Sequence, residues 1–94
     1  MEHKQTLEVD ALNQYLLNKT AVERLSHEIA DLGSTIADLD SRIELADETG
    51  TDSLADRLCE ERNNLNWRRL DLEEKKCKLE LKICEFEKIR QLTR

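Results

Sequence analysis

The chain contains no proline, two glycines and three aromatic residues among its 94 positions. A β-sandwich or barrel needs a tight turn roughly every 8–12 residues, and this composition cannot supply those turns. The two glycines, Gly33 and Gly50, also stand apart, so the chain lacks the glycine cluster that brings backbone close to phosphate in nucleotide-binding folds. These absences exclude both groups of folds and predict an all-α protein.

Long apolar runs are missing as well. No stretch approaches the roughly 18 apolar residues of a membrane span, and residues 1–6 show no apolar run behind a basic start, as a signal peptide would. Apolar residues make up 38% of the chain and are regularly spaced, which argues against disorder. We therefore expect a cytoplasmic protein without a membrane partner.

Charge is unevenly distributed along the chain, whose net charge is −6. Residues 1–50 carry eleven acids and four bases, whereas residues 51–94 carry ten acids and eleven bases. Two such halves attract each other when they lie side by side. The bases from Arg62 to Arg94 alternate with acids, and only two aromatic residues, Trp67 and Phe86, lie among them, so direct binding of nucleic acid is not expected.

The strongest pattern is a line of apolar residues whose steps alternate between three and four. It favours a helix with a coiled-coil seam, and its members are Val22, Leu25, Ile29, Leu32, Ile36, Leu39, Ile43 and Ala46. The line stops before Gly50, which can take the left-handed conformation that ends a helix. Thr51, Asp52 or Ser53 can each cap a following helix, and Ser53 with Asp56 resembles a capping box. A connection this short makes the two helices antiparallel.

A second line repeats every seven residues and comprises Leu58, Leu65, Leu72, Leu79 and Phe86. We therefore predict one helical-hairpin domain over residues 1–94, a two-helix coiled coil with helices at about 5–48 and 53–92 and a turn at 49–52. The expected register pairs residues whose numbers add to 97: Leu39 with Leu58, Leu32 with Leu65, Leu25 with Leu72, Asn18 with Leu79 and Ala11 with Phe86. The seam positions beside the second line, Glu61, Arg68, Lys75 and Lys82, are charged and are expected at the rim.

The N-terminal segment departs from this pattern. Val9, Leu12 and Leu16 form a stripe about 100° away from the line that begins at Val22. Asn18 could end a helix, and Thr20 with Glu23 forms a capping box that could begin another. Two interpretations remain: one long helix with a kink or a rotated face at residues 18–20, which we favour, or a separate short helix over residues 5–17.

A second apolar stripe follows the later helix and comprises Trp67, Leu70, Cys77, Leu81 and Cys84, with Glu74 filling one step. Leu65 and Leu70 lie about 140° apart around the axis, so both stripes cannot face the first helix. We predict a protein interface here. The favoured occupant is a second copy, giving a four-helix bundle, and the small residues Ser26, Ala30, Gly33 and Ala37 would let its helix approach. A helix of another protein and the chain's own N-terminal segment are the alternatives.

No residue pattern points to chemistry. Cys59, Cys77 and Cys84 form no C-x-x-C, and Cys77 and Cys84 lie about 10 Å apart along a helix, too far for a disulfide. Ligand spacings typical of zinc are missing, His3 and His27 are far apart, and no Glu-x-x-His occurs. We expect no catalytic residue, no metal and no cofactor, and hence no enzyme.

Two functions remain. The first is a non-enzymatic interaction module, such as an adaptor, an assembly chaperone or a structural subunit, that binds itself or a larger protein by helix-on-helix contacts with Trp67 as anchor. The second is a small acidic inhibitor or regulator, of the phage type that mimics nucleic acid, which blocks a basic groove or channel of a larger enzyme. In one form of this hypothesis the blocking group is the acidic turn, which contains Glu44, Asp47, Glu48 and Asp52. Electrostatic mimicry would weaken steeply with salt, whereas apolar recognition would not.

Overall fold

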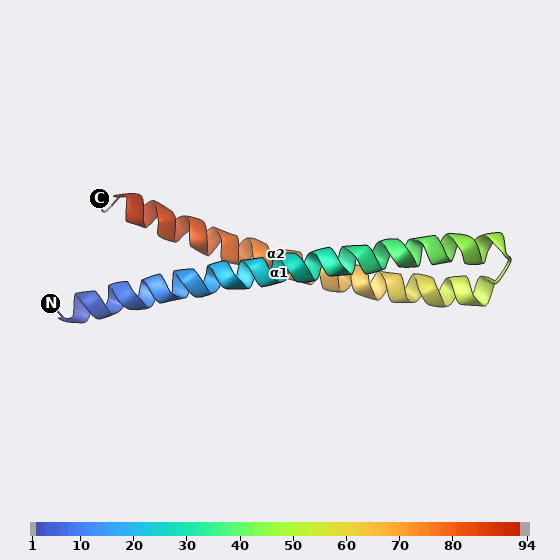
Figure 1. Cartoon of the computed structure of the whole chain (residues 1–94), viewed down its shortest axis with the longest axis horizontal. Coiled ribbons are helices and arrows are strands. Elements are labelled where there is room, and N and C mark those ends of the chain that lie inside the picture. Colours follow the sequence, from blue (N-terminus) through green and yellow to red (C-terminus); the bar gives the residue numbers. More distant parts are fainter. Residues whose placement is uncertain (1, 93–94) are drawn as a thin grey trace. The chain divides into compact units, whose positions relative to one another are not determined.

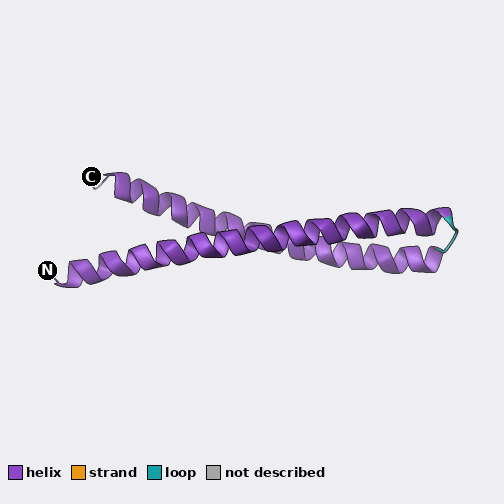
Figure 2. Cartoon of the chain, viewed as in Figure 1, coloured by secondary structure: helices purple, strands orange, loops and turns teal. Residues whose placement is uncertain are grey.

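The computed structural model describes the backbone of residues 2–92 and the side chains of residues 9–92. It contains two helices, α1 (Glu2–Glu48) and α2 (Asp52–Leu92), joined by residues 49–51 (Figure 1). No strand occurs within residues 2–92, and the connection between the helices is drawn in teal in Figure 2. The prediction of an all-α antiparallel helical hairpin is therefore confirmed. Over the same residues, neither helix has an apolar stretch long enough to cross a membrane.

The chain divides into two compact units, and each contains one segment of α1 and one of α2. The turn unit comprises residues 27–73 and includes the connection between the helices. The terminal unit comprises residues 1–26 and 74–94, of which residues 2–26 and 74–92 are described.

The turn is closed by backbone hydrogen bonds around Gly50. The Gly50 amide donates to the Asp47 carbonyl at 3.2 Å, and the Thr51 amide donates to the Ala46 carbonyl at 2.9 Å. Gly50 has a φ of 74°, and this pair of bonds around a left-handed glycine is the Schellman motif that ends many helices. The Thr51 carbonyl then accepts the first bond of α2 from the Ala55 amide at 3.0 Å. Thr51 therefore holds the N-cap position, and Asp52 and Ser53, the other capping candidates, lie inside α2.

The register of the two helices differs from the predicted one by about one helical turn. Tyr15, not Ala11, stacks on Phe86, with ring centroids 4.6 Å apart. Arg62 of the turn unit reaches Asp40 at 3.0 Å. The numbers of these pairs add to 101 and 102 instead of 97. The prediction that placed Ala11 opposite Phe86 is wrong, and the shared shift indicates the same correction for the other predicted rungs.

The turn explains this shift. A register that adds to 97 would require the chain to reverse near residues 48 and 49, one to two residues before the left-handed glycine. Because Gly50 itself is the reversal point, residues at equal distances before and after it come level, and their numbers add to about 100, close to the sums of the observed pairs. The observed register places Ile43 level with Leu58, Ile36 with Leu65 and Ile29 with Leu72.

The core of the turn unit is almost entirely contributed by α1. The buried apolar residues of this unit are Ile36, Leu39, Ile43 and Ala46 from α1 and Ala55 from α2. On α2, half-buried Leu58, Leu65 and Leu72 alternate with half-buried Arg62 and Arg69. The aliphatic stems of these arginines cover the seam while their charged ends stay at its edge.

The charged seam positions of α2 therefore lie one residue later than predicted. Glu61 and Arg68 in the turn unit, and Lys75 and Lys82 in the terminal unit, are all exposed. Their half-buried neighbours are Arg62, Arg69, Lys76 and Ile83. The seven-residue line allows a companion either three or four residues later, and the sequence does not decide between them, since Ile83 lies four after Leu79 and Ile89 lies three after Phe86.

In the terminal unit, α1 continues without a break through residues 18–20, so the alternative of a separate helix over residues 5–17 is wrong. Asn18 is only 8% exposed and lies in the seam, where its Oδ1 accepts a hydrogen bond of 3.0 Å from Gln14 Nε2. Thr20 does not cap a helix, because its hydroxyl donates to the Leu16 carbonyl one turn earlier. The seam of α1 thus extends to Tyr15, while Val9, Leu12 and Leu16 stay exposed.

Candidate protein-interaction surface

In the turn unit, the apolar stripe of α2 lies on the outer side of the helix. Trp67 is 68% exposed and Leu70 is also exposed, whereas Leu65 and Leu72 are half-buried in the seam. Each residue advances the helix by about 100°, which places Trp67 on the side opposite the seam. The unit therefore leaves its tryptophan in water. An apolar side chain of this size is the type that dominates protein interfaces.

In the terminal unit, the stripe continues with Cys77, Leu81 and Cys84, all of them exposed. Cys84 also lines a hollow of about 350 Å³ whose apolar floor includes Val22 and Ile83. Charged side chains border this hollow from both helices: Lys19, Glu23, Glu80 and Glu87. Within this unit, the hollow therefore shows that Lys19 and Glu23 of α1 lie on the same side as Glu80 and Glu87 of α2.

Tyr15 forms a polar group beside this hollow. Its hydroxyl donates a hydrogen bond of 2.7 Å to Glu87 Oε1, and Lys19 Nζ lies 5.1 Å from the centre of its ring. Hydrogen bonding with Tyr15 raises the pKa of the Lys19 amino group, and the negative charges of Glu87 and Glu23 add to that effect. The terminal unit is thus held by a stacked aromatic pair with a polar network on its exposed edge.

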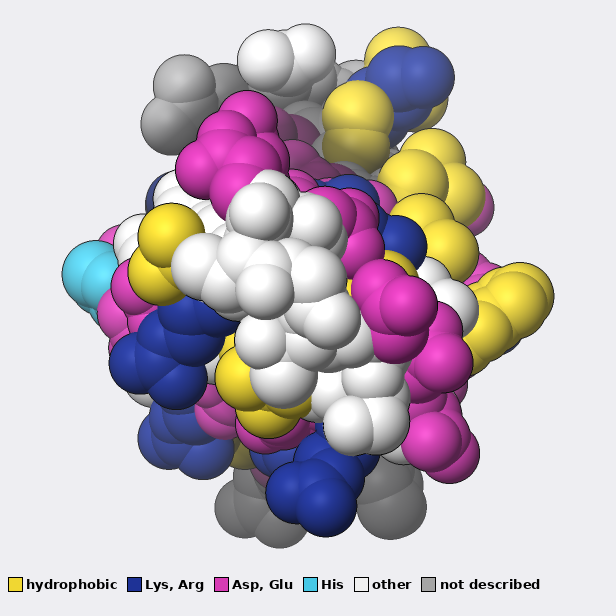
Figure 3. All heavy atoms as spheres, turned by 90° about the vertical axis from the view of Figure 1, so that its right-hand side faces the viewer, with side chains coloured by type: hydrophobic (Ala, Val, Ile, Leu, Met, Phe, Trp, Pro, Cys, Tyr) yellow, Lys and Arg dark blue, Asp and Glu magenta, His cyan; other side chains and the backbone are white. Residues whose placement is uncertain are grey.

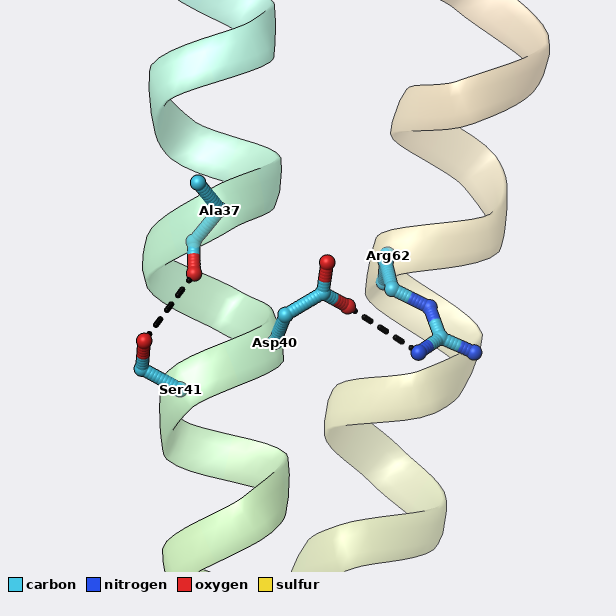
Figure 4. A network of polar contacts seen from close by, with 4 residues as sticks. All are labelled: Ala37, Asp40, Ser41 and Arg62. Carbon is cyan, nitrogen blue, oxygen red and sulfur yellow. Dashed lines mark hydrogen bonds and ion pairs between the residues drawn. The ribbon is translucent and has the colours of Figure 1, made fainter.

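The two sides of the turn unit differ in charge. On one side Arg62 Nη1 of α2 and Asp40 Oδ1 of α1 point at each other across the seam (Figure 4). Two helical turns before Asp40 lies Gly33, flanked on the same side by Ala30 and Ala37. Within 4 Å of a Cβ placed on Gly33 there is no neighbouring atom, so this part of the side is open.

Apart from the seam residues Arg62 and Arg69, the α2 residues on that side are uncharged over the same stretch. Two turns after Arg62 lies Arg69, and the neighbouring residues Asn63, Asn66 and Leu70 lie on the Asp40 side of α2. The opposite side instead carries the exposed charges of Glu28, Arg42, Glu61 and Arg68. We call the uncharged surface the small-residue face and define it by Ala30, Gly33, Ala37, Asn63, Asn66 and Leu70.

The acidic residues predicted at the turn are all exposed: Glu44, Asp47 and Glu48 near the end of α1, and Asp52 at the start of α2. Asp52 is favourably placed in the first turn of its helix, where backbone amides point outward. Seen from the turn, the surface mixes acidic, basic and apolar side chains (Figure 3). Acidic side chains are common at the ends of helices and in the turns between them. The structure shows no ligand-binding arrangement of these four residues.

One apolar hollow beside the turn is absent from the predicted sites. It measures about 330 Å³ and is lined by Arg42, Leu45, Ala46, Thr49, Leu54 and Leu58. Leu45 and Leu54 lie off the seam on either side of the turn, and both are exposed. Two off-seam leucines so close to a helix reversal were the signal for it in the sequence.

The potential metal ligands of the described residues do not form a cluster. No group of three or more His, Cys, Asp or Glu side chains among them is placed to hold a metal ion. Cys59, Cys77 and Cys84 are free thiols, Cys59 being half-buried. What the surface presents instead is exposed apolar area on α2.

Comparisons with protein families, with curated proteins and with solved structures find no match to this chain. The function is therefore argued from the surface itself.

Proposed function

We propose that this protein is a non-enzymatic protein-interaction module, and that the outer face of α2 binds a helix of a partner. The observation that carries this proposal is the 68% exposure of Trp67, on a helix whose seam is already paired with α1. An amphipathic helix is recognised through anchors spaced by three, four and seven residues. Trp67, Leu70, Cys77, Leu81 and Cys84 have that spacing.

The energetics favour this interpretation over a solvated face. Burying a large aromatic or aliphatic side chain is worth about 1.5–3 kcal/mol at the usual value per unit of apolar area. Several such side chains stand exposed on one helix, while its seam face contains two arginines and a lysine, Arg62, Arg69 and Lys76. A helix that packs only within its own hairpin would have its apolar side chains in the seam and its charged side chains outside. On α2 many of the apolar side chains lie outside, and a partner would bury them.

A pair of leucines with the same exposure supplies a matched test. Leu81 belongs to the stripe and Leu45 does not, and each is 60% exposed. Immobilised protein is incubated with an extract of its native cell, and retained proteins are quantified by mass spectrometry. Trp67→Ala and Leu81→Ala should each lower the retention of the specific partner, by about 30-fold in affinity for the tryptophan. Leu45→Ala should leave it unchanged.

Circular dichroism of each variant shows whether the helices are intact, so a loss of binding can be separated from a loss of fold. Equal retention by wild type, Trp67→Ala and Leu81→Ala would contradict the proposal. Binding that ignores these substitutions but falls steeply with ionic strength would instead favour recognition through acidic surface.

A further inference from the structure

We propose that the hollow of the terminal unit receives a long basic side chain, an arginine or a lysine, from a partner helix that lies on the stripe of α2. The partner is thus a basic amphipathic helix. This inference rests on the proposed function and states the chemistry of the partner. It is carried by residues of the terminal unit alone, and chiefly by Glu23 and Glu80.

The first argument is the position and lining of the hollow. Cys84 belongs both to the stripe and to the wall of the hollow, so the two surfaces are continuous. The volume of about 350 Å³ lies at the lower end of the range of small-ligand pockets, roughly 300–1,000 Å³, and suits a side chain. Val22 and Ile83 give the hollow an apolar floor. A lysine or arginine has the matching form, because its aliphatic stem packs on apolar atoms while its charged end reaches polar groups at the rim.

The second argument is the charge of the side chains that line the hollow. The lining contains three carboxylates and one cation: Glu23, Glu80, Glu87 and Lys19. The neighbouring cations of α2, Lys76, Lys88 and Arg90, are not among the lining residues. The hollow therefore carries a net negative charge, although the terminal unit as a whole contains more bases than acids.

The third argument is that the cation of the hollow serves only one of its two ends. Glu87 accepts the hydrogen bond of the Tyr15 hydroxyl, and Lys19 Nζ lies 5.1 Å from the centre of the same ring. Among the groups that raise the pKa of Lys19, Glu23 contributes least. Within the described part of the chain, Glu23 and Glu80 make no hydrogen bond and no ion pair. The end of the hollow away from Tyr15 is therefore acidic and uncompensated.

Glu23 and Glu80 also lie at nearly the same height on the two helices. Their numbers add to 103, close to the 101 of the stacked pair Tyr15 and Phe86 in the same unit. In a hairpin that packs only with itself, residues that flank the seam at one height carry opposite charges. A guanidinium or ammonium group between the two carboxylates converts their repulsion into charge-assisted hydrogen bonds.

The fourth argument is the contrast between the two sides of α2 in the terminal unit. The side away from the hollow exposes three lysines and one acid: Lys75, Lys78, Lys82 and Glu85. Lys82 and Cys84 each lie about 100° from Ile83, in opposite directions, which separates the lysines from the hollow. A basic helix is therefore repelled by one side of α2 and attracted to the other.

The first test uses the pure full-length chain and two synthetic helices of three heptads. The basic probe has leucines spaced by three and four with arginines beside them, and the neutral probe has glutamine in place of each arginine. Nuclear magnetic resonance follows the methyl groups of Val22 and Ile83. We expect the basic probe to shift both and to bind at least about tenfold more tightly than the neutral probe. Equal affinity of the two probes, no binding of the basic probe, or shifts confined to other residues would overturn the proposal.

Two variants then locate the charge. Glu80→Gln should lower the affinity for the basic probe about fivefold or more, whereas Glu85→Gln, on the other side of the same helix, should lower it by less than about twofold. Because Glu23 and Glu80 repel each other, Glu80→Gln should not lower the urea midpoint of the free chain. A lower midpoint together with an unchanged probe affinity would show that Glu80 stabilises the hairpin instead, and the proposal would be wrong.

The two proposals fail in different ways. If Val22 and Ile83 shift when the free chain is concentrated without a probe, a second copy occupies the hollow and the basic partner is wrong. If an extract protein binds in a Trp67-dependent manner and equally well to Glu80→Gln, the interaction module stands and the cation site is wrong. If binding ignores both Trp67 and Glu80, both proposals are wrong.

Discussion

The turn unit and the terminal unit are built from the same two helices but fill their seams differently. All the buried apolar residues among residues 9–92 belong to the turn unit, whereas the buried residue of the terminal unit is polar Asn18. The terminal unit also exposes Val9, Leu12, Leu16, Leu17, Leu81 and Ile89. The turn unit is thus the part that holds the hairpin together, and the terminal unit is the part with more apolar surface left over.

This difference has an energetic meaning. The free energy needed to open a region locally follows the apolar contacts that the region buries. The turn unit also gains from a short connection, since closing a short loop costs little entropy. We therefore expect the terminal unit to open first and the turn unit to set the global stability, a pattern that hydrogen exchange of backbone amides would reveal.

The largest effect is expected in the core of the turn unit. Leu39 is only 4% exposed, and Leu39→Ala removes its packing and leaves a cavity at the seam. The free energy of unfolding should fall by about 2–4 kcal/mol. Leu17→Ala, at an exposed position in the terminal unit, should change it by less than about 0.5 kcal/mol. Urea unfolding followed by circular dichroism measures both, and similar losses would show that the two units do not differ as described.

The second effect concerns the turn. Gly50→Ala forces a side chain into a left-handed conformation, φ 74°, and should cost about 1–2 kcal/mol. Gly33→Ala is the control inside a helix, where a Cβ meets nothing and helix propensity improves by about 0.5–1 kcal/mol. Urea unfolding at a protein concentration too low for association should give opposite signs for the two changes. The same sign would place the reversal elsewhere than Gly50.

The sequence was sufficient to predict the two helices but not their register. The spacing from Val22 to Ala46 and the isolated Gly50 were sufficient to predict two antiparallel helices. The register was not predicted, because leucines that repeat every seven residues fit several alignments equally well on α2. Only the hydrogen bonds of Asp47, Gly50 and Thr51 select one of these alignments.

For the candidate surface, the stripe from Trp67 to Cys84 was predictable as a pattern, and Trp67, Leu70 and Leu81 are indeed exposed. What occupies the stripe stays a prediction. The role of Tyr15 was not predictable, since the predicted register placed Ala11 opposite Phe86 and left Tyr15 outside the seam. Its position depends on Phe86, 71 residues later, and therefore on the register.

The third effect would make the terminal unit resemble the turn unit. Asn18→Leu replaces a buried amide in the seam by an apolar side chain, and the hydrogen bond to Gln14 is lost. A polar residue at a seam position specifies alignment at a cost in stability. We expect a gain of about 1 kcal/mol in the terminal unit, measured as slower hydrogen exchange at residues 15–22. Unchanged or faster exchange would show that the Asn18 amide is fully satisfied where it stands.

The smallest effect lies at the exposed edge of the terminal unit. Tyr15→Phe keeps the stacking on Phe86 but removes the hydroxyl that donates to Glu87 and hydrogen-bonds with Lys19. Stability at neutral pH should change by only a few tenths of a kcal/mol, because an exposed hydrogen bond is largely replaced by water.

The pKa of Lys19 reports this contact more sensitively than stability does. In the folded protein its amino group has a pKa raised above its ordinary value of 10.5, first through Tyr15 and then through the neighbouring acids. A raised pKa means that the interaction stabilises the fold fully below pH 10.5 and is lost as the pH rises through the folded value. Titration of the Lys19 side chain by NMR should therefore give a lower pKa in Tyr15→Phe, and a smaller decrease in Glu87→Gln. A large decrease in Glu87→Gln with none in Tyr15→Phe would show that the charge of Glu87, and not the Tyr15 hydroxyl, holds the proton on Lys19.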